Sequence, residues 1–287
     1  MTNEPLTDDE HELHYNPQRA VPHFKDYQAE RAASNGAARA QKTATLDVAY
    51  GAHALHKLDI FPAAASAGAA PVHVFLHGGY WRAQDKENFA FVAGTLVALG
   101  ITTVIVNYEL CPAATLDGVA ASAIAAVDWT RREIARFGGD PARITISGHS
   151  AGAHLGAEVL AVDWRAQGID PGFIRGAVLI SGIFDPAPAI RTTVNAELNL
   201  TPALAARHNV AQRAPTLACP ITILAGGREP WRWIDQSFAY SHHLRRHSLD
   251  PAVEVLPGYN HFDIMNQYLQ PDSAIVRAIR AQALDGP

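Results

Sequence analysis

Short apolar runs rich in valine and isoleucine recur along this chain of 287 residues, and longer segments with helical periodicity separate them. The runs lie at residues 72–76, 102–108, 143–147, 176–181, 221–226 and 252–258. Nearly continuous hydrophobicity over such short runs is typical of strands buried on both faces of a sheet. Their alternation with helices predicts an α/β fold, in which helices cover both faces of a mostly parallel sheet.

The segments around this alternation complete the expected architecture. Residues 44–50 and 54–62 look like a pair of strands that precedes it, so the sheet is expected to have about eight strands. Residues 1–43 contain helical fragments that should pack over the domain. Residues 182–215 carry prolines and break the alternation, so we expect a small cap insertion there. The range 1–287 is expected to form a single domain.

The charge and cysteine content argue against several classes of protein. The formal net charge is −5 and no basic cluster occurs, so neither nucleic acid nor an anionic membrane surface is an expected partner. No uninterrupted apolar run reaches about 18 residues, so no membrane span is expected. The first residues are acidic and polar, unlike a secretory signal. Only Cys111 and Cys219 occur, which predicts no disulfide framework and a cytoplasmic location.

Residues 148–152 read Gly-His-Ser-Ala-Gly and lie between the expected strand 143–147 and a helical segment. A G-x-S-x-G pattern in a strand–turn–helix context is typical of a nucleophile elbow, a sharp turn that exposes a serine hydroxyl at the end of a sheet. Flanking glycines avoid clashes in that turn. We therefore predict Ser150 as a nucleophile. The alternative is a serine that caps the helix beside incidental glycines.

A serine hydroxyl is a poor nucleophile without a base, and after such an elbow the chain order is serine, acid, histidine. His261 follows the last expected strand in a loop and is the predicted base. Glu229 follows the strand before it and is the predicted acid, which would fix the imidazole tautomer and stabilise the imidazolium. Asp185 and Asp235 stay open as alternative acids.

The sequence His77-Gly78-Gly79-Tyr80-Trp81 follows the strand at 72–76. Acyl transfer through a serine creates an oxyanion, which needs preorganised N–H donors. One donor comes from the residue after the nucleophile, here Ala151, and the other comes from the loop after the third strand. Gly78 and Gly79 are the predicted donors in that loop, with Gly79 favoured. A hydrogen bond from His77 is expected to hold the loop.

Aromatic residues follow both the glycine loop and the predicted acid. Tyr80, Trp81 and Trp231 are predicted to contact the substrate, because aromatic walls can hold a planar ring by edge or offset contacts. The alternative is that these are ordinary packing residues. Residues two apart on a helix point to different sides, so Trp231 and Trp233 are not both expected to face the site.

The 14 histidines raise the question of a metal site. His243 and His247 lie one turn apart on an expected helix, but no HExxH pattern and no Cys or carboxylate partner at ligand spacing accompanies them. A solvated helix face is the better interpretation. We expect no metal and no other cofactor.

Four segments, "HGGYW", "GHSAGAHL", "PGYNHFD" and "DQS", together resemble the kynurenine formamidase (arylformamidase) group of α/β-hydrolases. Residues 137–152 also resemble the hormone-sensitive-lipase-like esterases. The likeness covers most of residues 45–280 and implies an α/β-hydrolase fold with Ser150, Glu229 and His261 as its triad. The chain departs from the group at the acid, where many relatives have aspartate, and in the segment "GREPWRW".

The resemblance implies a serine hydrolase that cleaves a small amide or ester through an acyl-enzyme, with N-formylkynurenine hydrolysis to kynurenine and formate as the best single expectation. A short-chain esterase and an aryl amide or carbamate hydrolase are the alternatives. A non-catalytic binding protein of the same fold and a metal-dependent formamidase are less favoured. The expected partner is a small acyl substrate, and the sequence leaves a homodimer open.

Overall fold

The computed structural model describes residues 6–64 and 68–284 and contains an eight-stranded sheet. The strands are β1 (Thr45–Ala49), β2 (Lys57–Phe61), β3 (Ala70–Leu76), β4 (Thr102–Val106), β5 (Gly139–His149), β6 (Ile174–Ile180), β7 (Ile221–Gly226) and β8 (Ala252–Leu256). Their order is β1-β2-β4-β3-β5-β6-β7-β8. β2 is antiparallel to β1 and to β4, and the other neighbouring pairs are parallel. The expected mostly parallel sheet is confirmed.

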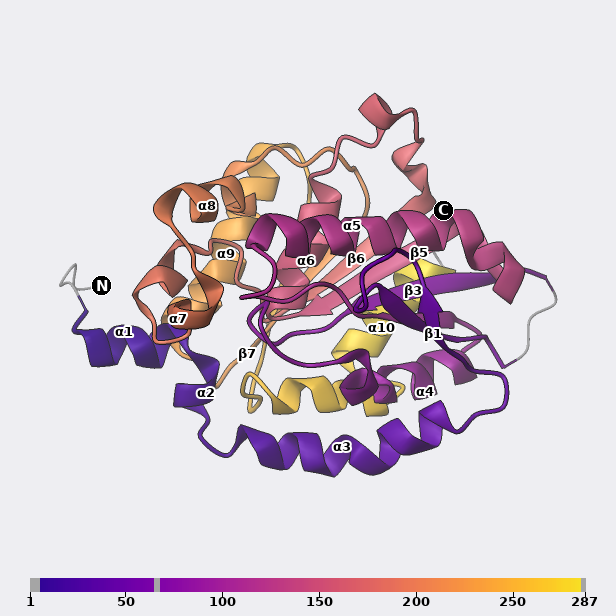
Figure 1. The fold of residues 1–287 in the computed structure, drawn as a ribbon, viewed down its shortest axis with the longest axis horizontal. Coiled ribbons are helices and arrows are strands. Elements are labelled where there is room, and N and C mark those ends of the chain that lie inside the picture. Colours follow the sequence, from indigo (N-terminus) through magenta and orange to yellow (C-terminus); the bar gives the residue numbers. More distant parts are fainter. Residues whose placement is uncertain (1–5, 65–67, 285–287) are drawn as a thin grey trace.

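Helices cover both faces of the sheet (Figure 1). They are α1 (Asp8–Tyr15), α2 (Pro17–Ala20), α3 (Phe24–Arg39), α4 (Phe91–Ala98), α5 (Leu116–Glu133), α6 (Ala151–Leu160), α7 (Asn195–Leu198), α8 (Pro202–Arg207), α9 (Trp231–Arg246) and α10 (Ala274–Leu284). α5 and α6 pack against one face, whereas α4 and α10 pack against the other and α3 lies outside α4. None of the described helices is long and apolar enough to cross a membrane.

The side chains of β3 point alternately into the two layers of the core. Val72, Val74 and Leu76 join the apolar cluster on the α5/α6 side, and Phe75 joins the cluster that includes α4 and α10. Successive residues of a strand point to opposite faces, so a strand that is apolar at nearly every position must be covered on both. The sheet is thereby held between two packed layers.

Two segments without strands flank the carboxyl end of the sheet. Residues 182–215 form four short helices: the 3₁₀ turn η5 (Ala187–Arg191), α7, α8 and the 3₁₀ turn η6 (Val210–Gln212). They contact α1 through η5 and α9 through η6. The N-terminal helices α1 to α3 run along the edge of the molecule, shown in indigo in Figure 1.

The sheet register determines which loops meet. Leu76 of β3 pairs with Gly148 of β5, and Gly226 of β7 pairs with Leu256 of β8. Parallel strands in such register end at the same edge. The glycine loop after β3 therefore leaves the sheet beside the turn after β5, and the loops after β7 and β8 also start side by side.

Candidate active site

Ser150 is the single residue between the end of β5 and the start of α6. Its backbone has φ +57° and ψ −119°, and its N–H donates a hydrogen bond of 2.8 Å to the carbonyl of Ile180 on β6. A positive φ is costly for a residue with a side chain, and it persists at functional sites where the surroundings enforce it. The Ser150 side chain makes no capping hydrogen bond to α6. Ser150 thus occupies the N-cap position of α6 without using its side chain as a cap.

The two glycines around Ser150 are required by close backbone contacts. A Cβ on Gly148 would lie 2.1 Å from the carbonyl oxygen of Gly152, and a Cβ on Gly152 would lie 2.0 Å from the carbonyl oxygen of Leu76. Both distances are far below van der Waals contact. The G-x-S-x-G spacing is thus a packing requirement of the turn and of its approach to β3.

His261 lies in the loop after β8 and lines the same cavity as Ser150. Its ring is almost fully buried, and the edge of Trp233 packs against it with ring centroids 5.0 Å apart. The Nε2–H of His149 donates to the His261 carbonyl at 2.7 Å. Burial, followed by the neighbouring His261, holds the pKa of His149 well below its ordinary value, so His149 is a neutral donor that positions the loop.

Glu229 is the acid that the fold brings to His261. Its Oε1 lies 3.5 Å from His261 Nδ1, and both side chains are buried. The same oxygen accepts a hydrogen bond from the hydroxyl of Ser181, which follows β6 directly. His261 Nδ1 has no hydrogen-bond partner within 6–64 and 68–284. A buried carboxylate beside an unpaired Nδ1 could fix the imidazole tautomer.

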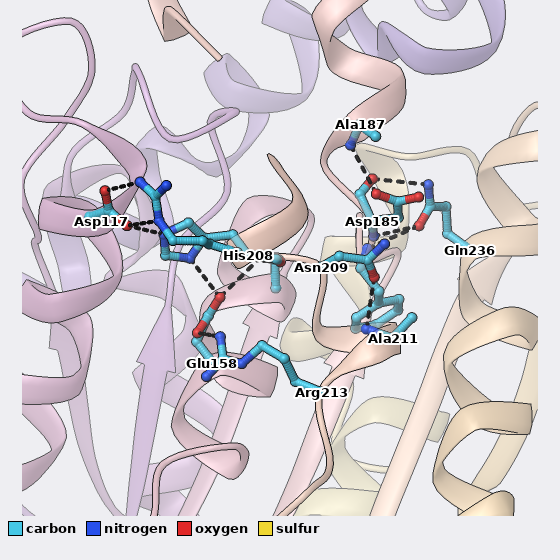
Figure 2. A network of polar contacts seen from close by, with 12 residues as sticks. Asp117, Glu158, Asp185, Ala187, His208, Asn209, Ala211, Arg213 and Gln236 are labelled. Carbon is cyan, nitrogen blue, oxygen red and sulfur yellow. Dashed lines mark hydrogen bonds and ion pairs between the residues drawn. The ribbon is translucent and has the colours of Figure 1, made fainter. Parts of the chain in front are cut away.

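The two alternative acids are engaged elsewhere. The carboxylate of Asp185 accepts the N–H of Ala187 at 2.9 Å, and the N–H of Asp185 donates to Gln236 Oε1 at 2.9 Å (Figure 2). Asp235 is exposed on α9. Neither carboxylate pairs with His261 among the described residues, and Glu229 is the one within ion-pair distance of it there.

The glycine loop lies against the turn that carries Ser150. Gly78 and Gly79 line the cavity with Ser150. A Cβ on Gly78 would lie 2.9 Å from His149 Nδ1, and a Cβ on Gly79, where φ is +123°, would lie 2.1 Å from the Ala83 carbonyl oxygen. Side chains are thus excluded at both positions, which leaves the loop backbone beside the serine.

Ala151 is the first residue of α6, and the first N–H groups of a helix have no partner within it. The Ala151 N–H therefore has no partner within α6 and lies directly after Ser150 in the chain.

His77 fastens the glycine loop from behind. Its Nδ1–H donates to the Gly78 carbonyl at 2.7 Å, and the Tyr108 hydroxyl donates to the His77 carbonyl at 2.6 Å. The His77 ring stacks on Tyr108 with centroids 4.3 Å apart. Burial lowers the pKa of His77 to about 4, so the ring is neutral at pH 7 and has a structural role.

The aromatic predictions are only partly met. Tyr80 lines the cavity, and its hydroxyl donates to the Tyr15 carbonyl at 2.7 Å. Trp81 does not line it and is fully buried with its ring against His154.

The prediction that Trp231 forms part of the cavity wall is also wrong. It begins α9 with 46% of its surface exposed and lies under the guanidinium of Arg232, 4.5 Å from the ring centroid. Trp233 is the buried partner, and its Nε1–H donates to the Ser181 carbonyl at 2.9 Å. As expected for positions two apart on a helix, the two rings point to different sides. Trp233 packs against the His261 ring, a contact that the sequence did not reveal.

The cavity beside Ser150 has about 670 Å³ of space, including its open mouth. Part of its wall comes from the N-terminal segment, which the sequence did not identify as part of the site. The contributing residues are Pro17, Gln18, Phe24, Gln28 and Arg31. None of the lining residues belongs to 182–215, so that segment does not form the wall of this cavity as a cap would. No sequence pattern predicts that α3 forms part of the wall, because its buried residues are Arg31 and Ala38 rather than an apolar stripe.

A buried polar network anchors residues 182–215 to the body of the molecule (Figure 2). His208 Nδ1 lies 2.8 Å from Glu158 Oε1 on α6, and His208 Nε2 lies 2.8 Å from Asp117 Oδ1 on α5. Arg213 pairs with Glu158 and Arg207 with Asp117. Burial works against the charged imidazole, but the hydrogen bonds and charges of the two carboxylates outweigh it and raise the pKa of His208. The segment is therefore attached by a histidine held between two acids, which favour its charged form.

The histidine pair on α9 differs from expectation. His243 is buried, and its Nε2–H donates to the Arg213 carbonyl at 2.7 Å, whereas His247 is exposed. A solvated face is thus correct for His247 alone. Within the described parts of the chain, potential metal-ligand atoms gather instead at His53, His56 and Glu109, within 4.8 Å of one another. These three residues do not line the cavity.

Comparison with known proteins agrees with this geometry. A family model described as alpha/beta hydrolase fold matches residues 73–264. A kynurenine formamidase of Danio rerio is 30% identical over 285 residues, which cover 96% of each chain, and esterase LipQ of Mycobacterium tuberculosis is 34% identical over 49% of this chain and 36% of its own. A solved structure from Silicibacter sp. TM1040, provisionally named a thioesterase, has a TM-score of 0.83 and 27% identity and covers 94% of this chain and 99% of its own. The resemblance inferred from the motifs is confirmed.

Proposed function

Because this chain belongs to the alpha/beta hydrolase family, in which it is similar to kynurenine formamidases over nearly its whole length, we propose that it is an aryl formamidase with Ser150 as nucleophile. His261 is the base and Glu229 the acid of this proposal. The substrate is a small aryl formamide such as N-formylkynurenine, and the products are the aryl amine and formate. The observation that carries the proposal is the positive φ of Ser150 beside a cavity that His261 also lines, in a chain similar to formamidases over nearly its whole length.

In the first half of the reaction, His261 accepts the Ser150 proton at Nε2 while Oγ attacks the formyl carbon. The backbone N–H groups of Gly79 and Ala151 stabilise the oxyanion. His261 then protonates the aniline nitrogen as the C–N bond breaks, which leaves a formyl ester on Ser150. In the second half, water loses a proton to His261 and attacks the ester. Formate leaves, and Ser150 regains its proton.

Glu229 supports both halves of the reaction from the far side of the imidazole. Its carboxylate, 3.5 Å from Nδ1, stabilises the imidazolium that forms each time Nε2 takes a proton. Ser181 holds the carboxylate by donating to Oε1. The imidazole itself is held by His149 at its backbone and by Trp233 at its ring. The base therefore needs little reorganisation during the reaction.

A short-chain esterase is the second candidate, and the partial likeness to esterase LipQ favours it. The same Ser150 chemistry would release an alcohol instead of an amine. The two functions are separated by kcat/KM for N-formylkynurenine against p-nitrophenyl acetate and butyrate. A formamide value 100-fold below the esters is about 2.7 kcal/mol in transition-state binding and would reject the formamidase proposal.

Ser150→Ala tests the nucleophile in either case. This variant should lose turnover and labelling by a fluorophosphonate, because the acyl-enzyme can no longer form. Ser34→Ala on α3 is the matched control and should keep both. Labelling of Ser150→Ala equal to that of the unaltered protein would identify another residue as the nucleophile. An unlabelled wild-type protein would favour a non-catalytic binding module.

The proposed setting is tryptophan breakdown in the cytoplasm. The free cysteines Cys111 and Cys219 fit a reducing compartment. The proposed partner is the small formamide substrate. Immunoblotting of separated cell fractions tests the location, and recovery outside the cytoplasmic fraction would contradict it.

A further inference from the structure

A buried guanidinium forms part of the cavity wall. Arg31 of α3 has only 5% of its surface exposed, and it lines the cavity that also holds Ser150 and His261. It is the one permanently charged side chain among the lining residues, and none of them is a carboxylate. The wall that faces the substrate therefore carries a positive charge.

The hydrogen bonds of Arg31 go to neutral groups, and the carboxylates of Glu30 and Asp263 act on its charge only from beyond ion-pair distance. Nε donates to the side-chain oxygen of Asn266 at 2.7 Å, and Nη2 donates to the Phe262 carbonyl. The guanidinium also lies over the Phe91 ring, 5.1 Å from its centroid. All three partners are neutral. No carboxylate oxygen of residues 6–64 and 68–284 lies within 4.0 Å of the guanidinium nitrogens, and Nη1 has no hydrogen-bond partner there.

Such an arrangement is unusual for a residue with a purely structural role. Arginine is rarely buried unless it is paired, because removing its charge from water costs several kcal/mol. Burial lowers the pKa of Arg31 to about 10, which still leaves it charged at pH 7. The neutral partners fix the orientation of the guanidinium but do not neutralise it. A rigid, unpaired guanidinium with a free N–H₂ group is suited to binding a carboxylate.

We propose that Arg31 binds a carboxylate group of the substrate, so that the enzyme selects acyl compounds that carry an anionic tail. The inference rests on the function proposed above and deepens it. Phe262, whose carbonyl holds Arg31, directly follows His261. A carboxylate bound by Nη1 therefore lies near the base, while the acyl group reaches Ser150. Because none of the lining residues is a carboxylate, like-charge repulsion of this anion comes only from side chains outside the wall, such as Glu30 and Asp263.

A pair of formamides that differ by one group provides the first test. N-formylkynuramine lacks only the carboxylate of N-formylkynurenine. Wild type should prefer the carboxylate substrate by at least tenfold in kcat/KM. Arg31→Gln should abolish most of this preference through a higher KM, and Arg31→Lys should retain part of it. Lys25→Gln removes an exposed charge from the same helix and should leave the preference unchanged.

An equal loss of activity on both formamides in Arg31→Gln would overturn the inference, because it would mean that Arg31 only attaches α3 to the loop after His261. No preference in the wild type would overturn it as well. This second comparison needs no variant and holds even if Arg31→Gln fails to fold.

The second test stays informative if the formamidase proposal fails. It measures inhibition of p-nitrophenyl acetate hydrolysis by 4-oxo-4-phenylbutanoate and by the corresponding neutral amide. The acid should have an inhibition constant at least tenfold lower than the amide in the wild type, and the difference should vanish in Arg31→Gln. Equal constants in the wild type would refute anion binding whatever the physiological substrate. A tighter acid without any formamide turnover would uphold Arg31 and reject the formamidase.

Discussion

Replacing Glu229 by glutamine tests the proposed triad at its acid. The change keeps the size of the side chain and removes its charge. Glu229 Oε1 lies 3.5 Å from His261 Nδ1, and both groups are buried, so solvent screens their interaction weakly. The carboxylate stabilises the imidazolium far more than the neutral ring. Its loss should therefore appear in kcat, since the imidazolium forms during the reaction.

The size of the effect follows from this separation. At 3.5 Å and an effective dielectric constant of about 20, two unit charges attract each other by about 4.7 kcal/mol. Each 1.36 kcal/mol is a factor of ten in rate, so kcat should fall by about 3,000-fold. A carboxamide can also donate to Nδ1, which favours the imidazole tautomer that cannot accept the serine proton at Nε2. The analogous change in serine proteases lowers kcat by about 10⁴.

The assay is steady-state hydrolysis of p-nitrophenyl acetate, with circular dichroism and thermal melting to show that the variant folds. Asp185→Asn and Asp235→Asn are the matched controls, because each removes one carboxylate that does not reach His261. Both should keep kcat within about threefold of the wild type. A folded Glu229→Gln variant with kcat within tenfold of the wild type would refute the assignment. A crippled Asp185→Asn beside it would identify that residue as the acid.

Three further changes test the surroundings of the triad. Gly79→Ala should lower kcat by at least about 100-fold, because a Cβ would displace the loop that supplies an oxyanion donor, and an unchanged kcat would contradict this. Trp233→Ala should lower kcat about three- to tenfold, because the ring contact with His261 is worth about 1 kcal/mol. Trp231→Ala should leave kcat unchanged. The same kcat in both variants would contradict a contribution of the Trp233–His261 contact. His208→Gln should lower the free energy of unfolding by about 2 kcal/mol at pH 6, because the buried Glu158 loses one charged hydrogen-bond partner and keeps only Arg213. Since the folded-state pKa of His208 is raised, its stabilisation is complete below the unfolded pKa of about 6.5 and is lost as the pH rises through the folded value. Urea denaturation should therefore show a smaller difference from wild type at pH 9, and a larger one would contradict the proposed charge state.

The turn at Ser150 could be predicted from the sequence because every requirement of that turn is local. A strand, two glycines at fixed spacing and a helix lie within a short stretch of chain. The glycines are needed for contacts that the turn itself creates, such as the 2.1 Å approach of a Gly148 Cβ to Gly152. The alternation of buried strands and helices was similarly visible, because a strand covered on both faces must be apolar at nearly every position. Local sequence thus determined the sheet, the elbow and the order of the functional loops.

The identity of the acid and the walls of the cavity depended on contacts between distant segments. Asp185 and Glu229 follow neighbouring strands, and their side-chain directions are decided by partners such as Gln236 and Ser181. Arg31 reaches the cavity from a helix whose buried face is not an apolar stripe, so its periodicity carried no signal.

The predictions for the aromatic residues were partly wrong for the same reason. A large apolar side chain can lie in the core, on the surface or in a pocket wall. Trp81, Trp231 and Trp233 are all apolar and large, yet one is in the core, one is exposed and one supports His261. Residue type determines how strongly a side chain seeks burial. Only the packing of the complete chain determines which surface buries it.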